Sequence, residues 1–195
     1  MRIVVAPDSF KGTASAVAVA EAVAAALRAA GHDPVAVPMS DGGEGFLDAL
    51  GGSNRTTSVT GPLGELVEAR WRLARGTAVI EMAEAAGLVL AGVAEENDPV
   101  EATTAGVGEL LVTAVESGAR RVIVGVGGSA TTDGGLGALR AMHPTQRFRG
   151  VDLTVACDVR TRFVDAAEVF APQKGASPTQ VEFLRRRLDR LAQVY

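Results

Sequence analysis

The sequence predicts an α/β protein that combines a parallel-sheet, Rossmann-like lobe with a second, mixed α/β lobe. The chain opens with a β-α-β-α order of elements, which is typical of a parallel sheet. Strand-like segments separated by short turns fill the middle of the chain and indicate hairpins. A buried strand then leads directly into a glycine-rich loop and a helix, which is where open α/β sheets bind their ligands.

The first lobe begins with a β-branched apolar run that predicts a strand over residues 3–6, ended by Pro7. Strong helix formers over residues 15–30 predict a helix with Ser15 as its N-cap and Gly31 as its stop. A second short strand is expected over residues 34–38. A polar, glycine-rich loop follows it and leads into an apolar helix start at residues 46–50.

The remaining elements are expected to build the second lobe. The pattern predicts strands over residues 55–59, 67–73 and 77–82 and a helix over residues 103–117. It also predicts a buried strand over residues 121–126. A strand over 153–157 and a helix over 178–194, capped by Ser177, complete the chain. We therefore expect residues 1–60 to form the first part of the Rossmann-like lobe and residues 61–195 the second lobe.

Composition limits the classes of partner. Hydrophobic residues make up 47% of the chain but aromatic residues only 4%, so the core must be aliphatic. A net charge of −4 provides no electrostatic footprint for nucleic acid or an anionic membrane. One cysteine cannot form an internal disulfide, and no apolar run suits a signal peptide or a membrane span. The sequence thus favours a cytoplasmic protein with small-molecule partners and without nucleic-acid or membrane binding.

The first loop that could carry chemistry follows the first strand, at residues 7–12 (PDSFKG). This loop could bind a metal-bound phosphate or a substrate carboxylate through the Asp8 carboxylate, the Lys11 ammonium and nearby hydroxyls. The alternative is a solvated turn in which Asp8 caps the local backbone.

The second loop spans residues 40–45 (SDGGEG). Gly42 and Gly43 would let backbone N–H groups approach an anion, and the following helix N-terminus adds its positive end. Asp41 and Glu44 could hold Mg²⁺. The alternative is an ordinary helix start with an acidic first turn.

The third loop, residues 127–137 (GGSATTDGGLG), is the most informative. Its glycines and three hydroxyl side chains supply donors with little bulk, as polyphosphate oxygens require. The spacing matches neither a P-loop nor a dinucleotide-binding fingerprint, which disfavours both of those enzyme classes. The alternative is a tight strand-to-helix turn capped by Asp133. Asp158, at the end of the strand over 153–157, is expected in the same cleft.

Eight segments, in order along almost the whole chain, resemble the bacterial type I glycerate kinase family, whose members phosphorylate D-glycerate with ATP and Mg²⁺. They are MRIVVAPDSFKG (1–12), PMSDGGEG (38–45), VTGPLGE (59–65), AVIEMAEAAGL (78–88), TTAGVGELL (103–111), VGVGGSATTDGGLG (124–137), ACDV (156–159) and VFAPQKGA (169–176).

The resemblance implies the glycerate kinase type I fold, with the active site in the cleft between two lobes. It implies catalytic roles for Asp8, Lys11 and Asp41, and metal binding by Asp133 and Asp158. Substrate or nucleotide binding is implied for Gly42, Gly43, Glu44, Gly127, Gly128, Ser129, Thr131, Gln173 and Lys174. As hypotheses, Lys11 and Lys174 contact anionic oxygens, the 127–135 loop contacts phosphates, and Asp8, Asp41 or Asp133 serves as metal ligand or base.

The expected function is that of an ATP-dependent glycerate kinase, which transfers the γ-phosphoryl group of ATP to a hydroxyl of D-glycerate. The implied cofactors are Mg²⁺ and the co-substrate ATP. The hydroxyl at position 2 is slightly favoured over that at position 3, although the sequence does not decide between them.

The chain departs from the family pattern in three places. Residues 142–153 form a short stretch where family members carry several dozen residues, so a sheet element is expected to be missing. Residues 160–163 (RTRF) replace an asparagine-proline loop. Family members also continue roughly as long again past the position of Tyr195, so the resemblance implies a shortened member without the family's C-terminal half.

Two alternative functions stay open. A catalytically silent nucleotide-binding or assembly module derived from this family would bind Mg·ATP without turnover. A different small-molecule kinase would consume ATP in the presence of another hydroxy acid. Pairing of two copies as a homodimer also stays open, because a shortened chain can expose a large apolar face.

Overall fold

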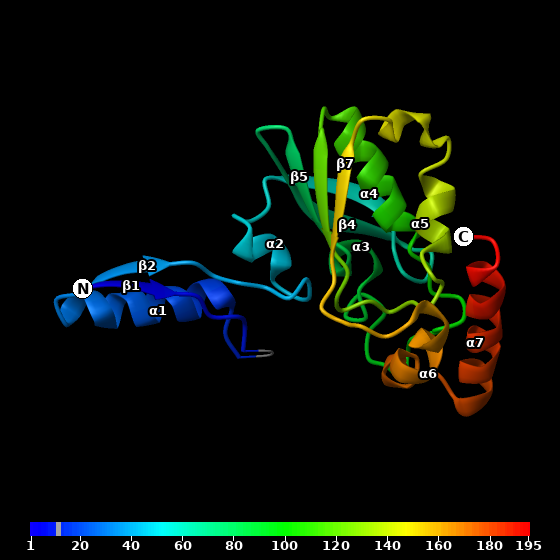
Figure 1. Cartoon of the computed structure of the whole chain (residues 1–195). Helices are drawn as coiled ribbons and strands as arrows, with labels where there is room; N and C mark the ends of the chain where they lie inside the picture. The colour runs from blue at the N-terminus through cyan, green and yellow to red at the C-terminus, as the bar shows by residue number, and fades with distance from the viewer. Residues whose placement is uncertain (11–12) are drawn as a thin grey trace.

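The residues that a computed structural model describes, 1–10 and 13–195, contain two β-sheets (Figure 1). The smaller sheet pairs β1 (Arg2–Val5) in parallel with β2 (Asp33–Ala36), and α1 (Ala16–Ala29) connects the two strands. This β-α-β unit is the one expected at the start of the chain. Figure 1 shows it projecting to the left, away from the larger sheet.

Small residues define the packing of α1. Ala16, Ala20 and Ala24 recur at every fourth position, lie on one face of the helix and are buried. The side chain of Ser15 accepts a hydrogen bond from the backbone N–H of Ala18 at 3.2 Å, which confirms the expected N-cap. Gly31 follows the helix with φ at +81°, a conformation that favours glycine.

The larger sheet has five strands whose spatial order follows the chain. These are β3 (Arg55–Thr60), β4 (Leu66–Ala74), β5 (Thr77–Glu81), β6 (Arg121–Gly125) and β7 (Asp152–Ala156). β3, β4 and β5 pair antiparallel, whereas β5, β6 and β7 pair parallel. Because β3 belongs to this sheet, a boundary drawn from strand pairing falls before Arg55 and not after residue 60.

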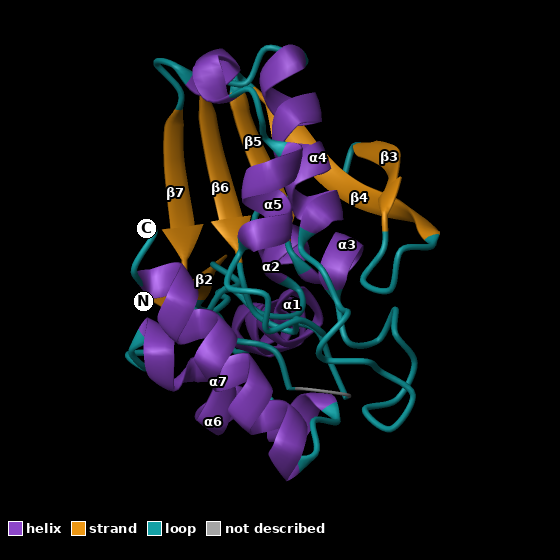
Figure 2. Ribbon diagram, turned by 90° about the vertical axis from the view of Figure 1, so that its right-hand side faces the viewer, coloured by secondary structure: helices purple, strands orange, loops and turns teal. Residues whose placement is uncertain are grey.

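Helices cover both faces of the larger sheet. α4 (Ala105–Glu116) and α5 (Leu136–Ala141) lie on the face turned toward the viewer in Figure 2. Leu110 of α4 packs there in a buried hydrophobic cluster with Ile80 and Trp71, so the core is not wholly aliphatic as expected. α2 (Phe46–Ala49) belongs to a separate cluster, in which Phe46 packs with Val79. Val79 and Ile80 join different clusters because successive strand residues point to opposite faces.

The last third of the chain adds a helical layer. α3 (Ala83–Ala86) directly follows β5, while α6 (Ala166–Phe170) and α7 (Pro178–Ala192) pack against each other through Ala167, Leu184 and Leu188. Ser177 and Gln180 form a reciprocal capping box at the start of α7. Single 3₁₀ turns occur at Thr145–Phe148, Phe163–Asp165 and Pro172–Lys174.

The short connection over residues 142–153 consists mainly of the 3₁₀ turn Thr145–Phe148. β6 and β7 are hydrogen-bonded neighbours on either side of it, so the connection leaves no gap between these two strands. Among the described helices, none combines the length and the apolar character needed to span a membrane.

Candidate active site

A cavity of about 590 Å³ lies where the carboxyl ends of the parallel strands β6 and β7 meet the loop that follows β2. The carboxyl edge of a parallel sheet is the usual place for a ligand in an α/β fold. We call it the main cavity. Its lining comprises Asp41, Gly43, Glu44, Leu88, Val126, Gly127, Gly128, Ser129, Ala156, Cys157, Asp158, Val159, Phe170, Gln173 and Lys174.

Glycines allow the second loop to pack closely against the third loop and the end of β7. The N–H of Gly127 donates to the carbonyl oxygen of Gly42 at 2.9 Å, which joins the second and third loops. A Cβ on Gly127 would overlap the Cα of Gly43, and one on Gly42 would lie 2.6 Å from the carbonyl oxygen of Ala156. Gly42 is buried and does not line the main cavity, so its side of the loop packs against β7.

Three carboxylates line the main cavity and are exposed: Asp41, Glu44 and Asp158. Asp41 accepts a hydrogen bond from the backbone N–H of Gly43 through Oδ1 at 2.8 Å. This bond fixes the turn through one of the two carboxylate oxygens. The main cavity therefore carries an excess of negative charge, which a divalent cation would offset.

Lys174 supplies the positive charge among the described residues that line the main cavity. Its Nζ donates to the hydroxyl oxygen of Ser129 at 2.9 Å and to the carbonyl oxygen of Thr131 at 2.5 Å. Lys174 is buried, and this burial lowers the pKa of its ammonium from 10.5 to about 8, against the opposing effect of Asp133. One of its three N–H donors remains for a ligand.

Asp133 lies away from the main cavity and is saturated with hydrogen bonds. Its Oδ2 accepts from the backbone N–H of Thr104 at 2.9 Å, from the Thr104 hydroxyl at 2.7 Å and from the N–H of Gly137 at 3.0 Å. Its Oδ1 accepts from the N–H of Gly135 at 2.9 Å. These four donors hold the turn into α5, so Asp133 has the capping role that was the alternative in the sequence analysis. Because both carboxylate oxygens are used in this way, metal binding by Asp133 is disfavoured.

Asp8 and Thr131 also lie apart from the main cavity. Asp8 is exposed and accepts from the N–H of Ser9 at 2.6 Å. The buried Thr131 hydroxyl donates to the carbonyl oxygen of Ala102 at 2.8 Å. Lys11 falls outside the described residues, so its expected role stays a prediction.

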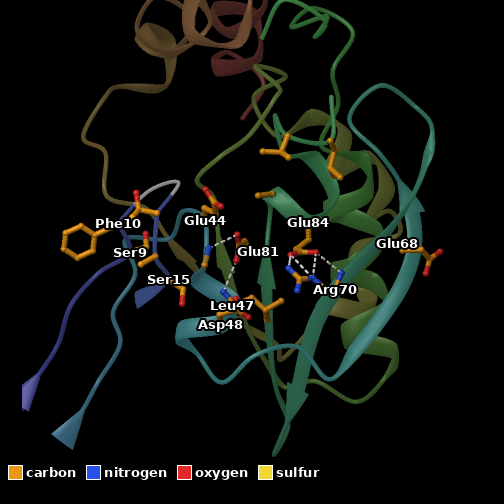
Figure 3. A pocket seen from close by; sticks show the side chains of 16 residues that line it. Ser9, Phe10, Ser15, Glu44, Leu47, Asp48, Glu68, Arg70, Glu81 and Glu84 are labelled. Carbon is orange, nitrogen blue, oxygen red and sulfur yellow. Dashed lines mark hydrogen bonds and ion pairs between the residues drawn. The ribbon is translucent and has the colours of Figure 1, made fainter. Parts of the chain in front are cut away.

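The loop that carries Asp8 contributes Ser9 and Phe10 to a second cavity of about 480 Å³ (Figure 3). We call it the acidic cavity; its charged lining residues are Glu44, Asp48, Glu68, Arg70, Glu81 and Glu84. Glu44 also lines the main cavity, so the two cavities adjoin there. Arg70 pairs with Glu84.

Glu81 is a site-forming residue that the sequence interpretation missed. It is 5% exposed at the end of β5, and its carboxylate accepts from the N–H of Leu47 at 2.9 Å and of Gly45 at 3.2 Å (Figure 3). Burial raises its pKa above the ordinary value although these two N–H groups oppose the shift. The sequence offered one signal for this role, an acidic residue directly after the apolar run TAVI (residues 77–80).

Asn97 was missed as well. Its Nδ2 donates to the carbonyl oxygens of Ala130 at 3.0 Å and of Lys174 at 2.8 Å, which ties the third loop to the segment that carries Lys174. Nothing in the local sequence around Asn97 predicts this bridge, because both partners are distant in the chain.

A model of the glycerate kinase family matches residues 3–145 and 142–195. The chain belongs to this family. The predicted fold class is thereby confirmed, since a crystal structure of a candidate glycerate kinase 2 from Salmonella typhimurium superposes with a TM-score of 0.86 at 34% identity. That match covers 100% of this chain and 63% of the other.

Curated relatives that carry the name glycerate kinase support the same family assignment. The chain is 39% identical to glycerate 2-kinase of Escherichia coli, with 100% of this chain and 61% of the relative covered. It is 38% identical to glycerate kinase of Bacillus subtilis, with 98% and 60% covered. The chain thus spans about three fifths of the length of these relatives.

The chain also differs in length from its glycerate kinase relatives within the matched region. The two family-model matches meet at residues 142–145. The match to the E. coli relative extends over 233 positions although this chain has 195 residues. The meeting point coincides with the short connection before β7, where the sequence departs from the family pattern.

Proposed function

We propose that this chain acts as an ATP-dependent glycerate kinase with its nucleotide phosphates in the main cavity. One observation carries the proposal: the main cavity gathers nine residues singled out by sequence, from four separate segments. They are Asp41, Gly43, Glu44, Gly127, Gly128, Ser129, Asp158, Gln173 and Lys174. Family membership and the names of the glycerate kinase relatives support the same reaction.

The donor set of the main cavity fits Mg²⁺ that arrives with a nucleotide. Among the described residues no group of three or more His, Cys, Asp or Glu could hold a metal by itself. Mg²⁺ bound together with phosphates needs only one or two carboxylates, and Asp158 would supply one of them. When bound, the ion would neutralise phosphate charge and orient the γ-phosphoryl group.

The protein's own residues then position the reactants. Lys174 would donate its remaining N–H to an anionic oxygen, and the exposed backbone at Gly128 offers room for close approach of a phosphate. Asp41 would accept the proton of the attacking hydroxyl, because it is exposed and lines the main cavity whereas Asp8 does not. Phosphoryl transfer from ATP to that hydroxyl yields ADP and phosphoglycerate.

The test is ADP release by the purified chain with Mg·ATP, in the presence and absence of D-glycerate. Phosphorus NMR of the product tells whether the hydroxyl at position 2 or at position 3 receives the phosphate; position 2 is the expectation.

The role of Asp41 is tested separately. Asp41→Asn should lower kcat at least 100-fold. The control is Asp33→Asn, exposed on β2, which should leave kcat unchanged. Near-normal kcat in Asp41→Asn removes Asp41 from the mechanism.

A catalytically silent nucleotide-binding module is the second candidate. The observation that favours it is Asp133, whose carboxylate is held by four hydrogen bonds within the protein and is therefore not available as the expected metal ligand. Saturable Mg·ATP binding without ADP release under any hydroxy acid would support this module and overturn the kinase proposal. ADP release that requires a hydroxy acid other than glycerate would instead identify a different acceptor.

A further inference from the structure

Asn97 lies in the loop between α3 and α4 and does not line the main cavity, yet its side chain contacts two segments that do. The residue is 8% exposed. The amide nitrogen Nδ2 carries two hydrogens, and both are used: one goes to the carbonyl oxygen of Ala130 at 3.0 Å and one to that of Lys174 at 2.8 Å. Carbonyl oxygens only accept, so these two partners fix which way the amide faces.

The same two segments are also joined by the side chain of Lys174. Its Nζ donates to the Ser129 hydroxyl and to the Thr131 carbonyl oxygen, which belong to the residues on either side of Ala130. Lys174 is therefore held at both ends. Asn97 binds its main chain, and the third loop binds its ammonium. The contacts close a ring in which Asn97 sets the spacing between the lysine backbone and the third loop.

Close backbone packing surrounds this ring. A Cβ on Gly175, directly after Lys174, would overlap the carbonyl oxygen of Ala94. The N–H of Ala130 donates to the carbonyl oxygen of Ala86 at 2.8 Å. The segment over residues 86–97 thus rests on the third loop at one end and on the lysine segment at the other. Asn97 binds both of them through a single atom.

The direction of the third N–H of Lys174 depends on this spacing. An ammonium group points its three donors to fixed corners, so two bound donors determine where the last one points. The two bound partners, on Ser129 and Thr131, are neutral oxygens, so these bonds leave the positive charge of Lys174 without a bound counter-ion. An anionic oxygen in the main cavity would supply one.

We propose that Asn97 is a positioning residue, which holds the main chain of Lys174 at a fixed distance from the third loop and so directs the free N–H of its ammonium into the main cavity. The inference rests on the proposed nucleotide site, because the nucleotide would provide the anionic oxygen that receives this N–H. Asn97 itself contacts no ligand and acts through Lys174.

The first test measures the ionisation of Lys174 by NMR of ¹³C-labelled lysine, without ligand, in Asn97→Ala and in the milder Asn97→Ser, which keeps one donor. The control is Asn54→Ala, since the Nδ2 of the exposed Asn54 also donates to a carbonyl oxygen, that of Leu73 at 3.0 Å. A lysine released from the third loop becomes solvated, and solvation favours its charged form.

We expect the pKa of Lys174 to rise from about 8 toward 10.5 in Asn97→Ala, to rise less in Asn97→Ser, and to stay at about 8 in Asn54→Ala. A pKa of about 8 in folded Asn97→Ala would overturn the positioning role.

The second test is a double-mutant cycle on Mg·ATP binding, measured by calorimetry. Asn97→Ala should weaken binding about 10-fold in the wild-type background. In the Lys174→Met background the same substitution should have no further effect, because the group that Asn97 positions is gone. Equal weakening in both backgrounds would mean that Asn97 only supports the fold of the loops, and the proposal would be wrong.

A wild-type measurement keeps the proposal testable if the Asn97 variants do not fold. The sequence contains two asparagines, so ¹⁵N-labelled asparagine gives two pairs of side-chain NH₂ signals, which Asn54→Ala assigns. The Asn97 pair should exchange with deuterium about 100-fold more slowly than the Asn54 pair, since both of its hydrogens are bound in a buried site. Equal exchange rates would show that Asn97 does not hold Lys174.

The outcomes separate this inference from the proposed function. If the wild type does not bind Mg·ATP but the pKa of Lys174 still rises in Asn97→Ala, Asn97 does hold the lysine and the nucleotide site is wrong. If the wild type binds Mg·ATP and the pKa of Lys174 does not change in Asn97→Ala, the positioning role fails and the nucleotide site stands.

Discussion

Asp133 and Asp158 were both expected to bind metal, yet their surroundings differ. Asp133 is 8% exposed and accepts four hydrogen bonds, three of them from backbone N–H groups. Asp158 is exposed and lines the main cavity. At the scale of the residue, burial and donor count thus favour a structural role for Asp133 and leave Asp158 available to a ligand.

Asp133→Asn should therefore destabilise the fold. One carboxylate oxygen becomes an NH₂ group that faces N–H donors, and hydrogen bonds to a charged group are worth about 1.5–3 kcal/mol. We expect the free energy of unfolding, measured by urea denaturation, to fall by about 2 kcal/mol. Asp158→Asn is the control and should change it by less than about 0.5 kcal/mol. Equal effects of the two substitutions would contradict the structural assignment.

The ionisation of Lys174 can be measured directly, because the sequence contains two lysines, Lys11 and Lys174. Lysine labelled with ¹³C at Cε should give two NMR signals. One of them should titrate with a pKa of about 8 and disappear in Lys174→Arg. A pKa near the ordinary value of 10.5 for that signal would show that Lys174 is solvated and not buried against Ser129.

The lowered pKa of Lys174 also fixes the sign of a stability change with pH. Burying the ammonium costs stability in full below pH 8, and the cost fades as pH rises toward 10.5, because only the unfolded state then binds the proton. The stability of the wild type relative to Lys174→Met should thus increase between pH 8 and 10.5. Urea denaturation at both pH values checks this; a constant difference would contradict it.

Single residues show what the sequence can and cannot predict. Asp41, Ser129 and Lys174 could be selected because they sit in short polar loops of family type. Asn97 could not, because its role comes from two carbonyl groups distant in the chain. The saturation of Asp133 was equally hidden, since one of its partners is Thr104, which precedes another helix.

At the scale of the elements, strand and helix positions follow from local pattern. The signals that set these bounds lie within a few residues of each element: apolar runs, the N-caps Ser15 and Ser177, and glycines at helix ends. The expected bounds therefore agree with the structure to within about two residues for most elements. The membership of β3 in the larger sheet depends on pairing with β4 and could not be predicted from the strand itself.

The loops are also elements whose function depends on neighbours. Glycines in the second and third loops were expected to make room for phosphates. The structure shows that Gly42 and Gly127 make room for other backbone, at β7 and at the second loop. This packing holds the rim of the main cavity before any ligand arrives.

Gly42→Ala tests the loop packing, with Gly64→Ala as a matched control. Both glycines have φ of +96°, so both substitutions strain the backbone equally. Only at Gly42 would the new methyl group meet another atom, 2.6 Å from the carbonyl oxygen of Ala156, whereas Gly64 faces open space. Gly42→Ala should be less stable than Gly64→Ala by about 1–3 kcal/mol in urea denaturation. Equal stability would mean that the second loop does not rest on β7.

At the scale of the whole molecule, the parallel strands bring four segments to one edge of the sheet. The second loop, the third loop, the end of β7 and the Pro172–Lys174 turn surround the main cavity. The acidic cavity adjoins it at Glu44. The proposed nucleotide site lies in the main cavity. Homodimer formation stays a prediction.

Hydrogen–deuterium exchange of the full chain with and without Mg·ATP tests this location most directly, because it needs no turnover. We expect Mg·ATP to slow exchange at residues 40–45 and 126–129, while the amides of α1 and of the β3–β4 hairpin keep their rates. Unchanged exchange in both loops, or protection confined to the acidic cavity, would contradict the placement of the nucleotide in the main cavity.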